Sequence, residues 1–341
     1  MKGLPLFLYP APAVIIYCAF ILPFTYPVVA YLAFCYAACL ASAGLLIRGL
    51  GKARNFQNIA AVIITFGFSY PILFCIDRGN IEVVGIVLCA GGLRFFIRKS
   101  YYLSAILFAI AVCIKPFPVL FFYLFLKRKL YRQSGVAAVT YVGVNLCALY
   151  WIGPTIPVAY NALKQGSALF FQNYVVRYHS HEIGFDHSLF SCVKQLLLMS
   201  TQRIPMWQVL GAAFLVYAGF CAVFVVFSGF YFWRKPALNQ LIAIIVLVLL
   251  VPPVSADYTL MALLLIWGAL FIHVTQEEVP HAITFLLPLA LLLTPQSYLR
   301  IGGTDFGGQA KAMLLLFLLG VAFRIDLPSR LFGDALPVKA V

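Results

Sequence analysis

Long apolar runs follow one another along almost the whole chain and are separated by short polar segments. A helix needs about 20 predominantly apolar residues to cross a bilayer, and many runs reach or approach that length. We therefore predict an all-α, polytopic membrane protein that forms a single integral domain over residues 1–341. The predicted spans lie at roughly 28–48, 57–76, 81–94, 135–152, 209–233, 238–252, 258–274, 281–296 and 311–324.

Two stretches do not fit a simple span. Residues 100–126 are too short for two full spans, and Lys115-Pro116-Phe117-Pro118 interrupts them. Two half-helices that meet at a polar break would solve this, because irregular backbone at membrane depth must line protein or a cavity. Residues 6–23 could form a span or a helix on the outer surface. The total is then about 9–12 transmembrane or re-entrant helices.

The composition excludes a soluble protein. Hydrophobic residues make up 64% of the 341 and charged residues 10%, which is more apolar side chain than one core in water can bury. The nine cysteines form no CxxC pair or disulfide framework, so we interpret them as small apolar residues.

The net charge of +14 is explained by topology rather than by nucleic-acid binding. Basic residues gather in four short interhelical segments without a carboxylate among them, which is the positive-inside pattern of cytoplasmic loops. These residues are Arg48, Lys52, Arg54, Arg94, Arg98, Lys99, Lys127, Arg128, Lys129, Arg132, Arg234 and Lys235. We predict that these four loops face the cytoplasm.

Acidic residues favour the opposite, outer face in this topology, so we expect the chemistry there. Most of the ten acids of the chain fall on it: Asp77, Glu82, Glu182, Asp186, Asp257 and Asp305. The densest group is Asp77-Arg78-Gly79-Asn80 with Glu82 just behind it. Charges are costly at a helix–lipid boundary, which favours a functional site. A solvated turn whose charges pair with one another is the structural alternative.

Residues 153–206 form the largest predicted non-spanning segment, a loop on the outer face. Aromatic and basic residues are interleaved in it, for example in Arg177-Tyr178-His179-Ser180-His181-Glu182. Aromatic faces stack on sugar rings and arginine holds phosphate, which suits a sugar–phosphate ligand. An interfacial aromatic belt explains the same pattern equally well. The histidines and acids at 179–187 match no defined metal site, so we predict no metal and no other cofactor.

Motifs of soluble enzymes are missing from the sequence. It contains no Walker loop, GxSxG, HExxH or dinucleotide-binding glycine pattern, so any donor is expected to arrive through the membrane. It also lacks a clear internal duplication of the kind seen in many transporters.

Four ordered segments carry a resemblance. The first joins Gly79-Asn80, the basic cluster at 94–99, Lys115-Pro116-Phe117-Pro118 and the basic cluster at 127–132. The others are Phe-Leu-Tyr-Pro-Ala-Pro at 7–12, His-Ser-Leu-Phe at 187–190 followed by Lys194, and Pro-Val-Ser-Ala-Asp-Tyr at 253–258. Together they resemble glycosyltransferase family 87, polytopic enzymes related to polyprenyl-phosphate-mannose-dependent mannosyltransferases.

The resemblance implies a C-type glycosyltransferase fold and transfer of a sugar from a polyprenyl-phosphate carrier to an acceptor. Such a reaction needs a carboxylate base for the acceptor hydroxyl and cations for the leaving phosphate. Arg78, Lys115 and Arg177 are the candidate cations, and Lys115 could instead be a snorkelling side chain. Asn80 and Ser188 could bind sugar hydroxyls or cap helices. The remaining candidate substrate contacts are Tyr9, Glu82, His187 and Tyr258.

Two departures from the family pattern concern the base. Family members carry an aspartate after a first helix, upstream of the segment that resembles 7–12, and no equivalent precedes Phe7 here. Ala256 and Tyr258 stand where Trp and His are usual. Three explanations are open: the start site is misassigned or the sequence is a fragment, Asp77 or Asp257 serves as a substitute base, or the protein is a non-catalytic relative.

We therefore predict a hexosyltransferase in a bacterial-type inner membrane, whose partners are a polyprenyl-phosphate sugar, a glycolipid or glycan acceptor and the bilayer, and no nucleic acid. The alternatives are a non-catalytic relative that binds lipid-linked sugars and a lipid or solute transporter. A transporter should show a pseudo-symmetric pair of broken helices, which the sequence does not show.

Overall fold

The computed structural model describes residues 9–21, 23–177, 183–201, 206–276, 282–295, 299–301, 304–327 and 332. It confirms an all-α protein, because the regular structure of these residues is helical apart from a hairpin of two short strands. The long helices are α2 (Pro27–Gly49), α3 (Phe56–Phe68), α5 (Glu82–Ile97), α6 (Tyr101–Ile114), α8 (Tyr131–Ile152), α9 (Ile156–Phe170), α10 (Leu189–Thr201), α11 (Trp207–Phe232), α12 (Ala237–Leu250), α13 (Leu263–Gln276) and α15 (Gly307–Arg324). The shorter elements are α1 (Ala11–Ile21), η1 (Gly51–Ala53), α4 (Tyr70–Asp77), η2 (Phe117–Phe121), α7 (Phe122–Lys127), η3 (Phe171–Val175), η4 (Ile183–Phe185), η5 (Asp257–Ala262), α14 (Ala282–Leu292), β1 (Arg300–Ile301) and β2 (Thr304–Asp305).

Six helical stretches are long and apolar enough to cross a membrane: Pro27–Arg48, Phe56–Asp77, Tyr131–Ile152, Trp207–Phe232, Asp257–Thr275 and Gly307–Arg324. Protein buries only 11% of the apolar window in Tyr131–Ile152 and 17% of that in Trp207–Phe232. Apolar helix faces left uncovered by protein are suited to lipid. The chain is therefore a multi-pass membrane protein.

The chain divides into two compact units. Unit 1 comprises Met1–Ser42 and Cys75–Tyr174, and unit 2 comprises Ala43–Phe74 and Val175–Val341. The boundaries fall within α2, α4 and η3.

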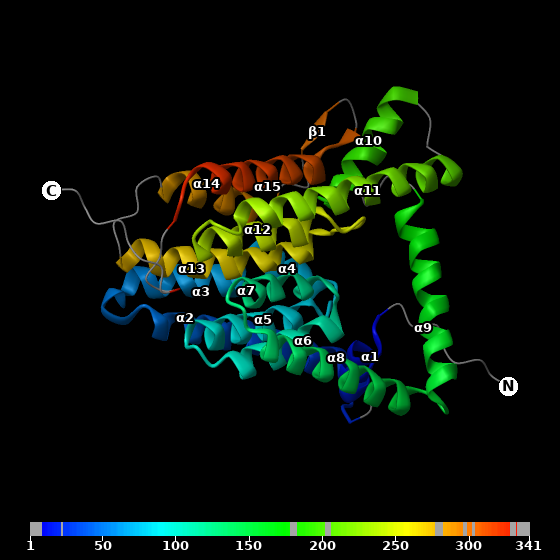
Figure 1. Cartoon of the computed structure of the whole chain (residues 1–341), viewed down its shortest axis with the longest axis horizontal. Helices are drawn as coiled ribbons and strands as arrows, with labels where there is room; N and C mark the ends of the chain where they lie inside the picture. Colours follow the sequence, from blue (N-terminus) through cyan, green and yellow to red (C-terminus); the bar gives the residue numbers. More distant parts are fainter. Residues whose placement is uncertain are drawn as a thin grey trace. The chain divides into compact units, whose positions relative to one another are not determined.

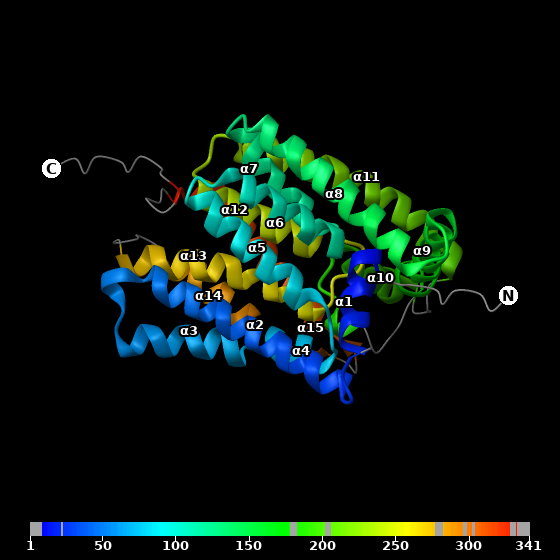
Figure 2. The same cartoon turned by 90° about the horizontal axis from the view of Figure 1, so that it is seen from below.

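Unit 1 is built around the pair α5 and α6, against which α1 and α8 also pack (Figure 2). The two helices approach closely because α5 has a glycine where it contacts α6. A side chain at Gly92 would collide with the Phe108 ring. The Ser104 hydroxyl donates to the Gly92 carbonyl at 2.7 Å. Small residues that admit a neighbouring helix are typical of membrane helix pairs.

The stretch 100–126 contains two helical segments with a break between them, as predicted. Helix α6 ends at Ile114, Lys115 is extended at φ −144° and ψ 143°, and η2 and α7 follow. The residue before a proline is disfavoured in helical conformation, so Pro116 places the break at Lys115.

The segment 153–206, predicted as a non-spanning loop, contains helices: α9, η3, η4 and α10 occupy most of its described residues, and none of the six stretches long enough to cross a membrane falls within it. In α9 the buried positions are Ala159, Ala162 and Gly166, one side of a helix. The buried side is formed by small residues, whereas the exposed positions mix polar residues such as Lys164 with apolar ones such as Val158 and Leu169. Residues 178–182, including Glu182, lie outside the described residues.

Unit 2 is organised by α12, which is buried on all sides and packs against α11, α13 and α15, while α14 packs on α15 (Figure 1). A helix that is apolar all round belongs in the interior.

The predicted span 57–76 consists of two helices rather than one, because Ser69 is extended and separates α3 from α4. The Tyr70 backbone N–H donates to the Leu293 carbonyl at 3.2 Å, so the break leaves that donor satisfied.

Candidate active-site residues

The turn at Asp77-Arg78-Gly79-Asn80 ends α4 in unit 1. Gly79 has a left-handed φ of 57°, its N–H donates to Ile76 at 2.9 Å, and the Asn80 N–H donates to Cys75 at 3.0 Å. This pair of bonds is a Schellman motif, in which glycine takes the left-handed position without steric cost. The motif leaves Asp77 and Arg78 exposed at the tip of the turn.

Asn80 serves the turn itself. Its side-chain oxygen accepts a hydrogen bond from the Glu82 backbone N–H at 3.0 Å, at the start of α5. The Tyr17 hydroxyl donates to the Gly79 carbonyl at 3.1 Å, and the Tyr9 and Tyr17 rings lie 5.6 Å apart. The Asn80 side chain thus stabilises the turn just before α5, whose N-cap residue is Ile81. The contacts also connect Tyr9 to the turn through Tyr17.

Glu82 and Lys115 form an ion pair inside unit 1. The Glu82 side chain is 1% exposed and that of Lys115 is 17% exposed. Lys115 comes from the break after α6 and Glu82 from the first turn of α5. A buried carboxylate needs such a partner, so Lys115 stabilises Glu82 and only its outer part contacts solvent.

Asp257 is the centre of a second cluster, in unit 2. Its Oδ2 accepts hydrogen bonds from the Tyr70 hydroxyl, at 2.7 Å, and from the Lys311 ammonium. The side chains of Asp257 and Lys311 are fully buried. Three separate segments, α4, η5 and α15, therefore meet at one carboxylate.

His187 lies beside this carboxylate. Its Nδ1 is 3.6 Å from Asp257 Oδ1, while its Nε2 is 3.0 Å from Ser255 Oγ and 3.2 Å from Thr259 Oγ1. The ring is fully buried, and its backbone N–H donates to the Ser255 carbonyl at 2.9 Å. His187 thus fastens the segment before α10 to η5.

Ser188 caps helix α10. Its hydroxyl accepts from the Ser191 N–H at 3.0 Å and donates to the Pro253 carbonyl at 3.2 Å. Asp186 Oδ1 accepts from the N–H groups of Ser188 and Ser255, at 3.0 and 2.9 Å. Both side chains are buried and act as helix cap and cross-link.

Two glycines allow these segments to approach. A side chain at Gly308 would collide with the carbonyls of Asp186 and Ile183, and one at Gly184 would collide with the Asp305 carboxylate. Acids predicted for one face, Asp186, Asp257 and Asp305, therefore gather at one end of unit 2.

The other two predicted substrate contacts in unit 2, Tyr258 and Arg177, are less buried than His187 and Ser188. The Tyr258 ring lies 6.5 Å from Phe74 at 14°, and Phe74 lies 5.6 Å from Phe185 at 14°, so the three half-buried rings are nearly parallel. Arg177 is exposed, and its carbonyl accepts from Lys194 Nζ at 3.3 Å.

The structure divides the predicted residues between the units. Unit 1 holds Tyr9, Asp77, Arg78, Asn80, Glu82 and Lys115, and unit 2 holds Arg177, His187, Ser188, Asp257 and Tyr258. Lys311 and Tyr70, which donate hydrogen bonds to Asp257, were not identified from the sequence. A lone lysine in an apolar helix is costly in a membrane and would have pointed to Lys311.

These features define a multi-pass membrane protein that carries paired ionisable groups within its helices. The model of glycosyltransferase family 87 matches residues 7–254, most of the chain, so the chain belongs to glycosyltransferase family 87. The match confirms the resemblance, and this is a membrane glycosyltransferase. No curated protein matches the chain. Asp257, Tyr258 and Lys311 lie beyond the matched residues.

Proposed function

We propose that this glycosyltransferase moves a hexose, mannose-like, from a polyprenyl-phosphate carrier to a glycolipid or glycan acceptor at the outer face of a bacterial inner membrane. Membership of the family supports sugar transfer. A sequence without nucleotide-binding motifs, in a chain that is largely membrane helix, supports a donor dissolved in the bilayer.

In the proposed reaction, the acceptor hydroxyl oxygen bonds to the anomeric carbon as the bond from that carbon to the phosphate oxygen breaks. The hydroxyl proton passes to a carboxylate, and polyprenyl phosphate leaves as an anion. A carboxylate base and a cation near the phosphate are therefore the minimum requirements.

Exposure is the observation that distinguishes the two candidate bases. A base must come within about 3 Å of the hydroxyl that it deprotonates. Asp77 is exposed at the tip of its turn, whereas Asp257 is enclosed and already accepts from Tyr70 and Lys311. We therefore assign the base to Asp77 and a positioning role to Asp257, which together with His187 and Ser188 holds η5 and α10 in place.

Arg78 is the preferred phosphate ligand, because it is exposed, lies next to the proposed base and can bind phosphate through two N–H groups. Lys115 contributes less charge to a ligand, since Glu82 offsets it. Asn80 and Glu82 shape the turn that presents Asp77. Tyr9, Arg177 and Tyr258 are proposed as contacts of the sugar or its carrier.

The test is transfer of labelled hexose from a polyprenyl-phosphate hexose by the purified chain in detergent, with several glycolipid and glycan acceptors. Asp77→Asn keeps the shape of the side chain and removes the base, so we expect kcat to fall about 100-fold or more. Arg78→Gln should instead weaken donor binding and turnover together.

Glu277→Gln is the matched control, because Glu277 lies between the predicted spans 258–274 and 281–296, and counting spans onward from the basic loop at 234–235 puts this segment on the cytoplasmic side. Full activity of Asp77→Asn beside an inactive but folded Asp257→Asn would reverse the assignment of the base. Binding of the labelled donor without transfer to any acceptor would favour the non-catalytic alternative.

A further inference from the structure

The corner between α11 and α12 in unit 2 is rigidly built. The Gln240 side-chain amide donates to the carbonyls of Phe232 and Lys235, at 3.0 and 2.9 Å. The Asn239 amide donates to Ala322 and Ile325, at 2.9 and 2.7 Å, at the end of α15. Both amides are buried, where each satisfied hydrogen bond constrains the backbone more than it would in water.

A cavity of ≈ 630 Å³ opens at this corner, and its lining combines aromatic and charged side chains: Phe230, Tyr231, Trp233, Arg234, Lys235 and Asp326. The cavity is large enough for a lipid headgroup or another small polar ligand.

The two cations that line the cavity differ in exposure: Lys235 is half-buried and Arg234 is exposed. Lys235 Nζ is 2.7 Å from Asp326 Oδ1 and 5.5 Å from the centre of the Tyr231 ring. The Tyr231 hydroxyl donates to the Phe323 carbonyl at 3.0 Å, so the wall beside Lys235 is held in place. Arg234 is exposed at the same corner. Arg324, exposed in the last turn of α15, follows directly after Phe323.

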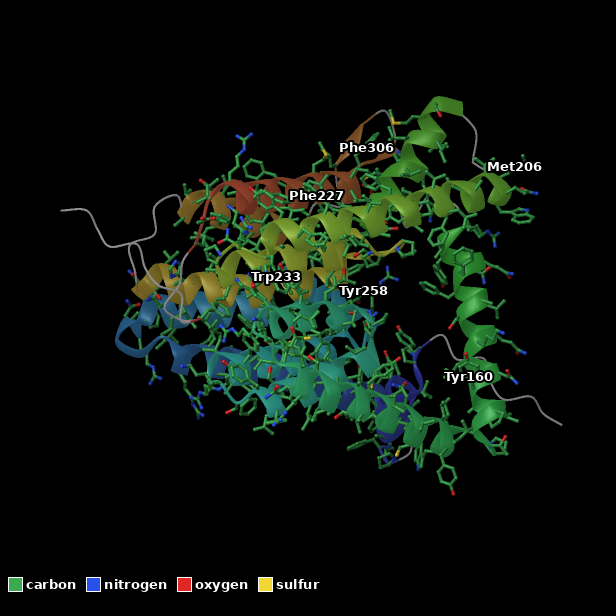
Figure 3. All side chains as sticks on the ribbon, viewed as in Figure 1. Tyr160, Met206, Phe227, Trp233, Tyr258 and Phe306 are labelled. Carbon is green, nitrogen blue, oxygen red and sulfur yellow. The ribbon has the colours of Figure 1, made fainter. Side chains whose placement is uncertain are left out.

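The apolar side of the cavity continues along α11. Phe230 is 79% exposed and Phe227 is 60% exposed, and Figure 3 labels Phe227 and Trp233 along this helix. Exposed phenylalanines on a membrane-spanning helix are suited to acyl chains, and tryptophan and tyrosine near its end are typical of the headgroup level.

From this combination we infer that the α11–α12 corner binds the phosphate headgroup of an anionic membrane lipid. Arg234 and Lys235 contact the phosphate, Trp233 and Tyr231 line the headgroup region, and the acyl chains run along Phe230 and Phe227. In the orientation that the basic loops predict, the corner faces the cytoplasmic leaflet, where anionic lipids attract clustered Lys and Arg. The inference is independent of the sugar-transfer reaction.

The test measures thermal unfolding of the full chain in a neutral detergent during titration with short-chain phosphatidylglycerol. A ligand that binds the folded state raises the unfolding temperature, which gives an apparent affinity whether or not the enzyme is active. Phosphatidylcholine of equal chain length tests the headgroup, and glycerol phosphate without chains tests for a soluble anion site.

We expect phosphatidylglycerol to stabilise the wild type more than either comparison ligand. Arg234→Gln should weaken its apparent affinity about fivefold, and Arg234→Gln with Lys235→Gln should weaken it about 20-fold. Arg98→Gln is the matched control, because this exposed arginine lies in another basic loop and does not line the cavity.

Three results would overturn the inference: equal stabilisation by phosphatidylcholine, equal stabilisation by glycerol phosphate, or a loss with Arg98→Gln as large as with Arg234→Gln. The last would mean that diffuse surface charge, rather than the corner, attracts the lipid. A further supporting result would be weaker lipid binding by Trp233→Leu at unchanged stability in the absence of lipid.

Discussion

Units 1 and 2 each pair a lysine with a carboxylate, but they expose these groups differently. In unit 1 the Glu82–Lys115 pair is reached by solvent at the lysine, and Asp77 lies exposed on the turn beside it. In unit 2 the Asp257–Lys311 pair is closed off on both sides, with Tyr70 as a third member.

The comparison indicates that a substrate can reach the exposed carboxylate of unit 1, whereas the enclosed cluster of unit 2 holds helices together. A general base has to reach its proton, which an enclosed, doubly hydrogen-bonded carboxylate cannot do without rearrangement. An enclosed pair instead penalises any conformation that separates its members, because each alone would be an unpaired buried charge. Both pairs therefore stabilise their units, and they differ in that only the unit 1 pair is reached by solvent.

The largest effect should come from breaking the enclosed pair. Lys311→Met leaves Asp257 without its cation and should lower the free energy of unfolding by about 3–5 kcal/mol. Unfolding by SDS titration measures it. Adding Asp257→Asn should restore much of the loss, because an amide oxygen still accepts from Tyr70. Lys235→Met, at a solvent-exposed pair, should cost about 0–1 kcal/mol. Equal losses at the two pairs would contradict the distinction.

The unit 1 pair should respond asymmetrically. Lys115→Met leaves the buried Glu82 unpaired and should cost about 2–3 kcal/mol. Glu82→Gln leaves a lysine that can turn towards water, so its cost should be smaller. The same SDS titration measures both. A larger loss for Glu82→Gln would mean that Lys115, rather than Glu82, depends on the pair.

Gly308→Ala tests the close approach that assembles the unit 2 cluster. The added methyl meets the carbonyls of Asp186 and Ile183, so the variant should lose about 1–3 kcal/mol of unfolding free energy. Gly320→Ala on the same helix is the matched control. Nothing lies within 4 Å of its added carbon, and alanine should stabilise the helix by about 0.5–1 kcal/mol. Opposite signs are expected, and losses of equal size would contradict the packing argument.

The smallest predicted effect concerns the turns of unit 1. Lys99 and Lys129 occupy left-handed positions, at φ 62° and 56°, of the kind that Gly79 fills without strain. Lys99→Gly should therefore raise the free energy of unfolding by about 0.5–1 kcal/mol, whereas Gly79→Ala should lower it by a similar amount. Changes of the same sign in both variants would show that side-chain contacts, not backbone conformation, dominate these turns.

Periodicity and hydropathy predicted much of the fold. Most predicted spans correspond to helices, and Lys115-Pro116 correctly predicted the break after α6, because proline acts on its immediate neighbours. The helix α9 within the segment 153–206 was not predicted, because its buried face consists of alanine and glycine, whose burial carries little hydrophobic signal.

The sequence showed which polar and charged residues were candidates for the site, but not which residues each of them contacts. Asn80 and Ser188 were predicted either to bind sugar hydroxyls or to cap helices, and their backbone partners, the N–H groups of Glu82 and Ser191, are known only from the structure. Asp77 and Asp257 were both candidate bases, and our proposal in favour of Asp77 depends on the contacts of Asp257 with Tyr70 and Lys311. These partners lie 187 and 54 residues away along the chain, which no local pattern encodes.

The apolar runs alone predict an all-α membrane protein, and the ordered motifs of the chain led to the glycosyltransferase family. Both properties are carried by contiguous residues: apolar runs that lipid requires, and short motifs that survive as local patterns. The exposure of Asp77 and the enclosure of Asp257 depend on the folded structure instead. Asp77 lies at the tip of the turn that Gly79 allows, whereas Asp257 is covered where α4, η5 and α15 meet, contacts that join residues far apart in the chain.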